Sequence, residues 1–180
     1  MREKATDTNL PLSRPLDGPG ALARLALAPV PLFVLQPLLG RIVRKIATLR
    51  PEIFGRIGPH TSKCFLIDPV NMPFVLVLHP DPARPRLRAA RRHNAPAYDA
   101  RIAGSFLTLL AVADGRLDGD ALFFTRELVI EGDTEAAVCL RNALDDQEGG
   151  IADDVAAMFG PPGKATLALL RRVGSHDDDK

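Results

Sequence analysis

The segment from Ala121 to Asp146 constrains the fold of this chain more than any other part of the sequence. It opens with the aromatic pair Phe123 and Phe124, in a run of residues that favour β-structure. The alternation that follows places Leu128 and Ile130 on one face of a strand. The first half of the segment therefore predicts a half-buried strand.

The second half of this segment predicts a sharp turn and an amphipathic helix. Asp133, directly after Gly132, can accept a hydrogen bond from the free N–H groups of a first helical turn. Glu135 adds negative charge where the helix dipole is positive. Apolar residues then recur at helical spacing, at Ala136, Leu140, Ala143 and Leu144. This strand–turn–helix unit contains no obvious nucleophile, metal cluster or phosphate-binding loop.

The size and composition of the chain fit one globular domain with an appended arm. A fold of 180 residues buries roughly 70% of its unfolded surface, so it needs no disulfide. The aromatic residues are almost all Phe, with one Tyr and no Trp, which suits an apolar interior. Cys64 and Cys139 lie among apolar neighbours, so we expect two free thiols in a compartment that is not oxidising.

The first part of the chain is rich in proline. Residues 1–20 are expected to form a flexible leader. The apolar stretch 25–39 is short for a membrane span, and we expect Pro29, Pro31 and Pro37 to break it. A secretory signal is not expected either, because acidic residues precede this stretch and no small-residue cleavage site follows it.

An amphipathic, basic arm is expected over residues 21–57. From Leu38 to Ile57 an apolar stripe faces a basic side, and Pro51 starts a second helix or kinks the first. Such a helix beside an apolar segment is typical of an interfacial membrane anchor. We expect membrane contact through Arg41, Ile42, Arg44, Lys45 and Ile46. The alternative is that the stripe packs against the domain.

The domain proper is expected over residues 58–173, followed by a disordered acidic tail at 174–180. Ser105 is expected to cap an apolar helix. Pro161–Pro162–Gly163 is expected to stop one helix, with a last helix over 164–172. The strands are expected at 64–67, 74–78, 85–91, 98–103 and 128–131. The second of these is apolar at every position, so both of its faces should be buried.

Several chemical functions are not supported by the residues. The acidic loop after Asp114 has Arg116 in place of a calcium ligand and Thr125 in place of the bidentate Glu. The four histidines have no metal-site spacing. Ser105 lacks the flanking glycines of a nucleophile elbow. We therefore expect no metal, no cofactor and no catalytic activity.

The charge distribution is uneven although the net charge is only +1. The first hundred residues are basic, and carboxylates dominate from Asp114 to Asp154. The arginine run from Arg84 to Arg92 could bind the phosphates of a nucleic acid backbone. However, no aromatic side chains lie between these arginines to stack on bases. We expect no nucleic acid partner. The uneven charge is compatible with binding to an anionic membrane surface, and it is equally compatible with two ordinary solvated faces of the protein.

Three segments resemble the sterol-carrier (SCP2-like) lipid-binding domains, in the order in which that family has them. They lie between Phe65 and Asp146 and read LIDPVNMPFVLVLHPDPARPRLR, DARIAGSFLTLLAVADGRLDGD and LFFTRELVIEGDTEAAVCLRNALDD. The resemblance implies an α/β (α+β) fold with a twisted, mostly antiparallel five-stranded sheet covered by helices around an apolar tunnel. The segment order expected from the residues agrees with this fold.

The resemblance also implies which residues line the tunnel. Carried over position by position, they are Phe106, Leu107, Leu110, Phe123, Phe124, Leu128, Ile130 and Leu140. Such a tunnel removes a lipid tail from water, worth roughly 0.8 kcal/mol for each buried CH₂ group, so no polar catalyst is needed. Ordinary core positions would show the same residue types.

More narrowly, the chain resembles the accessory factors of oxygen-independent (anaerobic) ubiquinone biosynthesis. This implies a non-catalytic protein in the cytoplasm, peripheral to the inner membrane, that holds polyprenylated ubiquinone intermediates. Its implied partners are isoprenoid quinone precursors, phospholipid, the membrane surface and the U32-peptidase-like iron–sulfur hydroxylases of the pathway, which carry out the chemistry. The alternatives are a general sterol or fatty-acyl carrier and, less favoured, a nucleic-acid-binding module.

Overall fold

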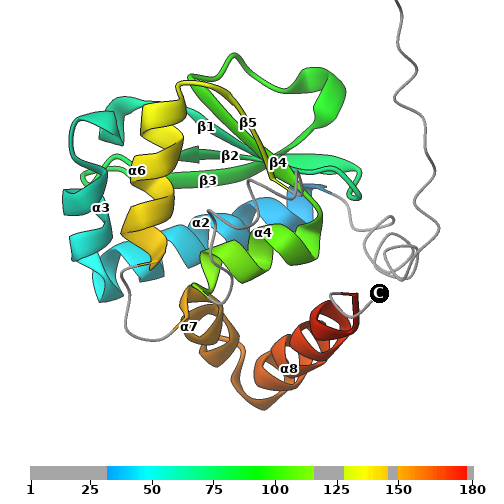
Figure 1. Cartoon of the computed structure of the whole chain (residues 1–180). Coiled ribbons are helices and arrows are strands. Elements are labelled where there is room, and N and C mark those ends of the chain that lie inside the picture. The colour runs from blue at the N-terminus through cyan, green and yellow to red at the C-terminus, as the bar shows by residue number, and fades with distance from the viewer. Residues whose placement is uncertain (1–31, 116–127, 146–149, 178–180) are drawn as a thin grey trace, which may run out of the picture.

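The structure, a computed structural model, describes residues 32–115, 128–145 and 150–177, with side chains described as far as Arg172 (Figure 1). The helices are α2 (Leu32–Leu49), α3 (Pro51–Ile57), α4 (Phe106–Ala113), α6 (Thr134–Asp145), α7 (Ile151–Ala157) and α8 (Gly160–Asp177). The strands are β1 (Phe65–Pro69), β2 (Phe74–His79), β3 (Arg86–Arg91), β4 (Ala100–Gly104) and β5 (Leu128–Gly132). The short 3₁₀ helices η1 (Gly58–Ser62) and η2 (Arg92–Asn94) precede β1 and follow β3.

The five strands form one open sheet in the order β3-β2-β1-β4-β5. β1 and β4 run parallel, and the other three neighbouring pairs are antiparallel. Each expected strand is found within two residues of its expected bounds. The expected SCP2-like architecture, a mostly antiparallel five-stranded sheet covered by helices, is confirmed.

Strand β2 is buried on both faces, as its continuous apolar sequence predicts. Phe74, Leu76 and Leu78 face the helices, while Val75 and Val77 face the other side of the sheet. Because side chains alternate along a strand, the two sets cannot share a face. The sheet therefore needs cover on both sides.

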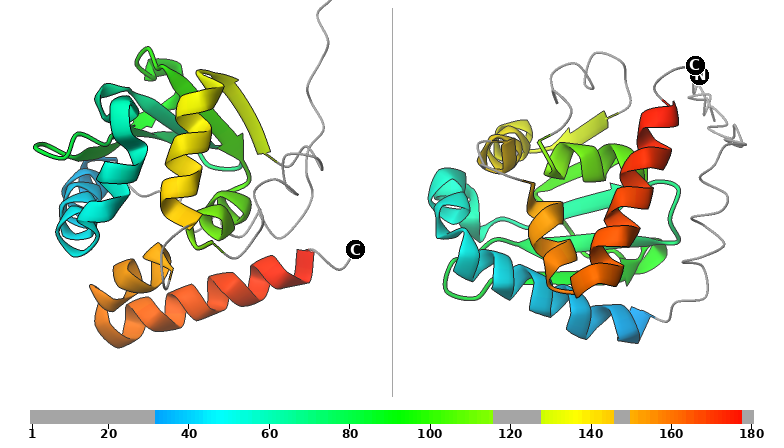
Figure 2. Two further views of the ribbon diagram at one scale, coloured as in Figure 1. Left: turned by 60° about the vertical axis from the view of Figure 1, so that its left-hand side comes forward. Right: turned by 90° about the horizontal axis from the view of Figure 1, so that it is seen from below.

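Helices α2, α3, α4 and α6 cover one face of the sheet, and α7 and α8 lie below them, farther from the strands (Figures 1 and 2). The main core lies between the sheet and this layer. It includes Ile46 of α2, Ile53, Phe54 and Ile57 of α3, Phe65 of β1, Val112 of α4 and Leu140 of α6. The arm expected at 21–57 therefore contributes, through residues 32–57, to the core itself.

The other face of the sheet carries an ionic network around Asp68, whose side chain is only 3% exposed. Arg92 Nη2 lies 2.7 Å from Asp68 Oδ1, and Arg101 Nη2 lies 2.6 Å from Asp68 Oδ2. Arg101 also reaches Glu131, directly opposite it on β5. Burial alone would raise the pKa of Asp68, but hydrogen bonds and charge from both arginines outweigh it and hold this pKa below its usual value.

Two expected helix caps are confirmed. Ser105 Oγ accepts a hydrogen bond from the Thr108 N–H at 3.0 Å, at the start of α4. Asp133 Oδ1 accepts one from the Ala136 N–H at 2.9 Å, at the start of α6. Lys63 Nζ also contacts the Asp133 carboxylate, and this hydrogen bond, with the one from Ala136, lowers the pKa of Asp133.

Proline positions account for two differences from expectation at the ends of the described chain. Pro37 does not break the apolar stretch, because α2 begins at Leu32 and runs through it. The ring removes only the hydrogen bond to the Phe33 carbonyl, near the exposed start of the helix.

Pro51 is the first residue of α3. Of its two expected roles, starting a second helix or kinking the first, it therefore has the first.

The second difference concerns the last helix. We expected Pro161–Pro162–Gly163 to stop a helix, with the next one starting at 164, but α8 already begins at Gly160. Proline is tolerated in a first turn, where its missing N–H would have no helical partner. Helix α8 also continues to Asp177, so the backbone of 174–177, expected to be disordered, is helical here.

Candidate lipid-binding cavity

A cavity of about 240 Å³ lies between the sheet and the helices α2, α3, α4 and α6. All of its described lining side chains except Arg141 are hydrocarbon. The strands contribute Ile67, Leu76, Leu78, Leu87, Ile102, Leu128 and Ile130. An enclosure of this composition favours an apolar guest, because it offers almost no hydrogen bonds in exchange for those that a polar guest makes with water.

Alternation and helical spacing explain why these residues meet. Leu128 and Ile130 are two positions apart on β5 and so point to the same side of the sheet. On α6, Ala137, Leu140, Arg141 and Leu144 recur at intervals of three and four and form one face of the helix. The strand–turn–helix unit thus supplies both a strand wall and a helix wall of the cavity.

Three of the residues expected to line a tunnel face this cavity: Leu128, Ile130 and Leu140. Their contact with a lipid stays a prediction. Phe123 and Phe124 lie outside the described residues.

The three expected residues on α4 lie elsewhere. Phe106 packs against the cluster of Met72 and Phe74. Leu110 packs against a cluster formed by α7 and α8, and Leu107 is half-buried outside the lining. The face of α4 that meets the cavity instead carries Leu109, Val112 and Ala113. A short helix that is apolar on all sides gives no sequence signal of which side faces a cavity.

The residues expected to contact a membrane separate into two groups. Arg41, Arg44 and Lys45 are exposed on α2. Ile42 and Ile46 line the cavity, so in this structure they face the protein interior. Contact of α2 with a membrane through its basic side stays a prediction, and contact through the two isoleucines would require α2 to leave this position.

Sequence reasoning missed part of the cavity wall. Ile53, Phe54 and Ile57 of α3 line it, together with Val43 of α2. The signal in the sequence is the apolar stripe from Leu39 to Ile57, which favours a membrane-facing arm, with packing on the domain as the alternative. Packing on the domain is what the described part of the stripe does.

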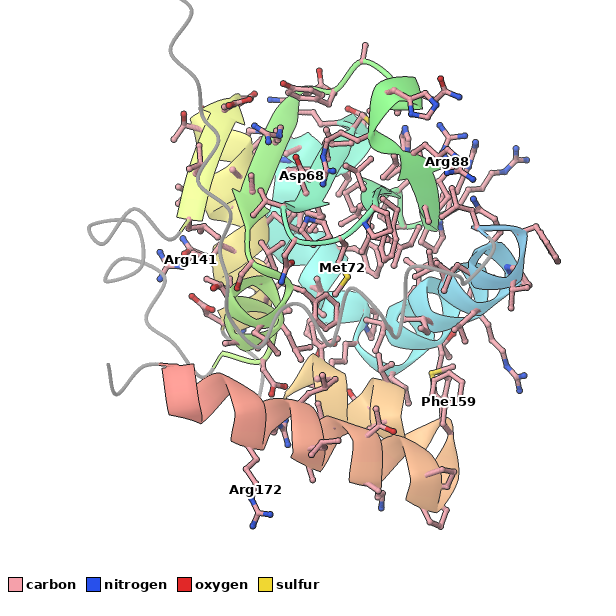
Figure 3. All side chains as sticks on the ribbon, turned by 90° about the vertical axis from the view of Figure 1, so that its right-hand side faces the viewer. Asp68, Met72, Arg88, Arg141, Phe159 and Arg172 are labelled. Atoms are coloured by element: carbon pink, nitrogen blue, oxygen red, sulfur yellow. The ribbon has the colours of Figure 1, made fainter. Side chains whose placement is uncertain are left out.

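Arg141 is the one charged side chain among the described lining residues. Its Nε lies 3.0 Å from Asp145 Oδ2, one helical turn further along α6, and its side chain is 17% exposed. Figure 3 shows Arg141 at the outer side of the molecule, away from α2. The guanidinium therefore lies at the rim of the cavity, and the aliphatic stem can join the apolar wall.

Helices α7 and α8 close the region below the cavity. Ile151 of α7 is a lining residue, and Arg50 Nε lies 2.6 Å from Asp154 Oδ2, which ties α7 to the α2–α3 junction. Arg171 of α8 pairs with Asp153 and with the buried Asp114 after α4, at 2.8 and 2.5 Å. Hydrogen bonds from Asp153 first, and from Asp114, raise the pKa of Arg171, although burial opposes them.

The described titratable groups offer little for catalysis. No set of three metal-ligating side chains comes together in the described part of the chain. Burial first, and then the Asp99 charge, raise the pKa of the Cys64 thiol, which disfavours the nucleophilic thiolate. In the ranges that the structure describes, no helix combines the length and the apolar character needed to cross a membrane.

The family model of the SCP-2 sterol transfer family matches residues 54–145. The chain belongs to this family. Its fold is also similar to solved structures: a UbiJ-SCP2 ubiquinone synthesis protein (16% identity, 74% of this chain, 94% of that chain, TM-score 0.44) and sterol carrier protein 2 from Yarrowia lipolytica (10%, 63%, 91%, TM-score 0.43). Palmitated SCP2L2 from Aedes aegypti is another (13% identity, 64% of this chain, 96% of that chain, TM-score 0.44). A search of curated proteins gave no match.

The family match covers the sheet and the helices α4 and α6, together with the end of α3. It leaves out α2, α7 and α8. Yet Ile42 and Ile46 of α2 and Ile151 of α7 line the cavity. In this SCP2 domain the cavity wall is thus completed by elements that lie outside the family match.

Proposed function

We propose that this protein is a non-catalytic lipid carrier that holds polyprenylated ubiquinone intermediates, with the apolar tail in the cavity. The observation that carries the proposal is the cavity wall, which is hydrocarbon at every described lining position except Arg141. Each CH₂ group that such a wall removes from water stabilises the complex by roughly 0.8 kcal/mol. Membership of the sterol transfer family supports the carrier role.

The ubiquinone part of the proposal is supported by the sequence from Phe123 to Asp146, which resembles the accessory factors of the oxygen-independent pathway. In this role the iron–sulfur hydroxylases that resemble U32 peptidases would be the partners that modify the bound ring. A general sterol or fatty-acyl carrier is the second candidate, favoured by the family description. Its cavity would bind a tail regardless of the ring attached to it.

We also propose that the protein acts at the cytoplasmic surface of the inner membrane. Arg41, Arg44 and Lys45 are exposed on α2. Because Ile42 and Ile46 face the cavity, the contact with phospholipid would be electrostatic and made by these basic side chains. A carrier at such a surface can take up and release lipids without exposing their tails to water.

Mass spectrometry of the organic extract from protein purified without detergent tests the proposal. We expect polyprenylated phenols or quinones in near-stoichiometric amounts. Recovery of phospholipid alone would leave a lipid carrier and contradict the ubiquinone role. An empty protein that also fails to take lipid from vesicles would contradict both. Deletion of the gene should lower ubiquinone in anaerobic growth and leave it unchanged in aerobic growth.

Adjacent positions on β5 give a matched pair of variants for the cavity. Ile130 lines it, while Val129 points to the other side of the sheet and is 46% exposed. Ile130→Phe should narrow the cavity and lower the amount of co-purified lipid. Val129→Phe places the same side chain outside the cavity and should leave the amount of co-purified lipid unchanged. Equal lipid content in both variants would show that the lipid is bound elsewhere.

A further inference from the structure

Helix α2 has an outer and an inner side of opposite chemistry. The outer side is exposed and basic, with Arg41, Arg44 and Lys45. The inner side is apolar and supplies three residues of the cavity wall, Ile42, Val43 and Ile46. In the view from below, α2 runs along the edge of the molecule (Figure 2). The helix that meets an anionic membrane in the proposed function is therefore also an outer wall of the lipid cavity.

Polar contacts hold α2 in place near both of its ends. Near the start, Gln36 Nε2 donates a hydrogen bond to the Ala89 carbonyl oxygen of β3 at 2.6 Å. Just after the end, Arg50 Nε lies 2.6 Å from Asp154 Oδ2 of α7. Arg50 has non-helical backbone angles, φ −135° and ψ 62°, and Pro51 begins α3 directly after it. A residue that leaves the helical path between two helices is the kind of position at which one helix can pivot against the next.

The free energy of moving α2 away from the sheet depends on what surrounds the helix. In water this movement exposes Ile42, Val43 and Ile46 together with the strand wall behind them, and the hydrophobic effect opposes it. At a bilayer the same side chains can enter the boundary between head groups and acyl chains, which offsets much of that cost. The basic side of α2 is attracted to such a surface when the lipids are anionic. The closed position is therefore favoured more strongly in water than at an anionic membrane.

We propose that α2 is the gate of the lipid cavity and opens at an anionic membrane, so that a tail passes directly between the bilayer and the cavity. The inference rests on the proposed carrier function and its membrane contact, and adds the route by which a lipid enters and leaves. Docking is electrostatic, and α2 returns Ile42 and Ile46 to the wall once the tail has passed. Helix α3, which carries Ile53 and Phe54 of the same wall, stays in place because it packs against α6.

The transfer of a fluorescent lipid from the full chain to vesicles that contain a quencher, followed by stopped flow, tests the gate. The lipid is an anthroyloxy-labelled stearate or an anthroate ester of geranylgeraniol, and the vesicles contain phosphatidylcholine alone or with phosphatidylglycerol. Gln36→Met keeps the length of the side chain and removes the hydrogen bond that ties α2 to β3. Thr48→Val is the matched control. Thr48 Oγ1 donates to the Arg44 carbonyl oxygen at 2.9 Å, so its loss also removes one side-chain hydrogen bond, but one that lies within α2.

We expect transfer to vesicles with phosphatidylglycerol to be at least about tenfold faster than transfer to phosphatidylcholine alone, and to rise with vesicle concentration. Gln36→Met should raise the rates of uptake and release by the same factor, about twofold to tenfold. The affinity should stay unchanged, because the hydrogen bond is present in the closed protein with or without lipid and absent only in the open one. Thr48→Val should transfer lipid at the rate of the unmodified protein.

Unchanged transfer rates in Gln36→Met, or a lower affinity without faster uptake, would show that α2 is a fixed wall, and would leave the carrier function standing. Transfer rates that ignore the composition and concentration of the vesicles would mean that lipid leaves through water, and would overturn the opening at the membrane. A protein that takes up neither fluorescent lipid would contradict both the gate and the carrier function. If Gln36→Met does not fold, Gln36→Asn, whose shorter amide falls short of Ala89, takes its place in the same comparison.

Discussion

Asp68 is the residue at which charge contributes most plainly to the stability of the fold. Its carboxylate forms ion pairs with Arg92 and Arg101. Arg92 Nη2 also donates hydrogen bonds to the Pro69 and Met72 carbonyl oxygens, at 3.2 and 3.1 Å. The network connects β1 with β4, with the turn after β1 and with the segment after β3. A buried carboxylate held by two cations loses much of its stabilising effect when it is protonated.

We predict that Asp68→Asn lowers the free energy of unfolding by about 2–3 kcal/mol at neutral pH, because it removes the buried carboxylate that Arg92 and Arg101 share. The folded pKa of Asp68 is depressed, so its contribution is fully present above the usual aspartate pKa. This contribution is lost as the pH falls from the usual aspartate pKa to the lower pKa that Asp68 has in the folded protein. Urea unfolding across this range should therefore show less loss of stability with acid for Asp68→Asn than for the unmodified protein. Parallel pH profiles would contradict the pairing.

Gly132 shows a backbone requirement at the end of β5. Its φ is +79°, and a Cβ at this position would overlap the Asp99 carbonyl oxygen, which accepts a hydrogen bond from the Asp133 N–H at 2.8 Å. Gly132→Ala should destabilise the protein by about 1–3 kcal/mol through strain and displacement of this turn. Gly55→Ala is the control, since Gly55 lies inside α3 with nothing within 4 Å of a new Cβ. Gly55→Ala should leave the free energy of unfolding unchanged or raise it by up to about 1 kcal/mol. Thermal unfolding of both variants measures the difference. Equal effects of both substitutions would contradict this account.

At the level of elements, the sequence predicted most of the fold because local signals and packing agreed. The alternating and fully apolar runs give the five strands, and Ser105 and Asp133 give the starts of α4 and α6. Proline was the less reliable signal. Pro161 lies in the first turn of α8, where its missing N–H has no helical partner, so it does not stop a helix there. Pro37 lies inside α2 and removes one helical hydrogen bond, and the helix continues through it.

The cavity was less predictable than the fold. Core and cavity residues have the same chemistry, so Leu110 and Leu109 look alike in sequence although only Leu109 lines the cavity. Arg141 was not foreseen at all. An arginine on an amphipathic helix usually marks the solvated side, and only the arrangement of α6 against the sheet places it at the cavity rim.

Helix α2 is the element whose role changed most, and a pair of neighbouring positions tests that role. Ile46 is 8% exposed and lines the cavity, while Arg44, two residues earlier, is exposed. Ile46→Ala should lower the free energy of unfolding by about 2 kcal/mol or more and weaken lipid binding. Arg44→Ala should change stability by no more than about 0.5 kcal/mol. If Ile46→Ala left stability unchanged in denaturant unfolding, α2 would not be packed on the domain in solution.

At the scale of the whole molecule, the basic residues gather on neighbouring elements although the net charge is only +1. Helix α2 packs along β3, where Gln36 Nε2 donates to the carbonyl oxygen of Ala89 at 2.6 Å. The exposed basic side chains of this region are Arg41, Arg44 and Lys45 on α2 and Arg86, Arg88 and Arg91 on β3. A surface of this kind can attract anionic lipid even when the whole protein is nearly neutral.

We predict that the protein sediments with vesicles that contain anionic phospholipid, binds neutral vesicles weakly, and dissociates as salt is raised. Each basic side chain near such a surface contributes roughly 1 kcal/mol, so Arg41→Glu with Arg44→Glu should weaken binding by at least about tenfold. Lys164→Glu with Arg172→Glu makes the same change in net charge on α8, where both side chains are exposed, and should have a much smaller effect. Equal losses from the two double variants would mean that net charge, and not the α2 surface, governs the contact. Binding that salt does not weaken would indicate apolar insertion, for which α2 would have to withdraw Ile42 and Ile46 from the cavity wall.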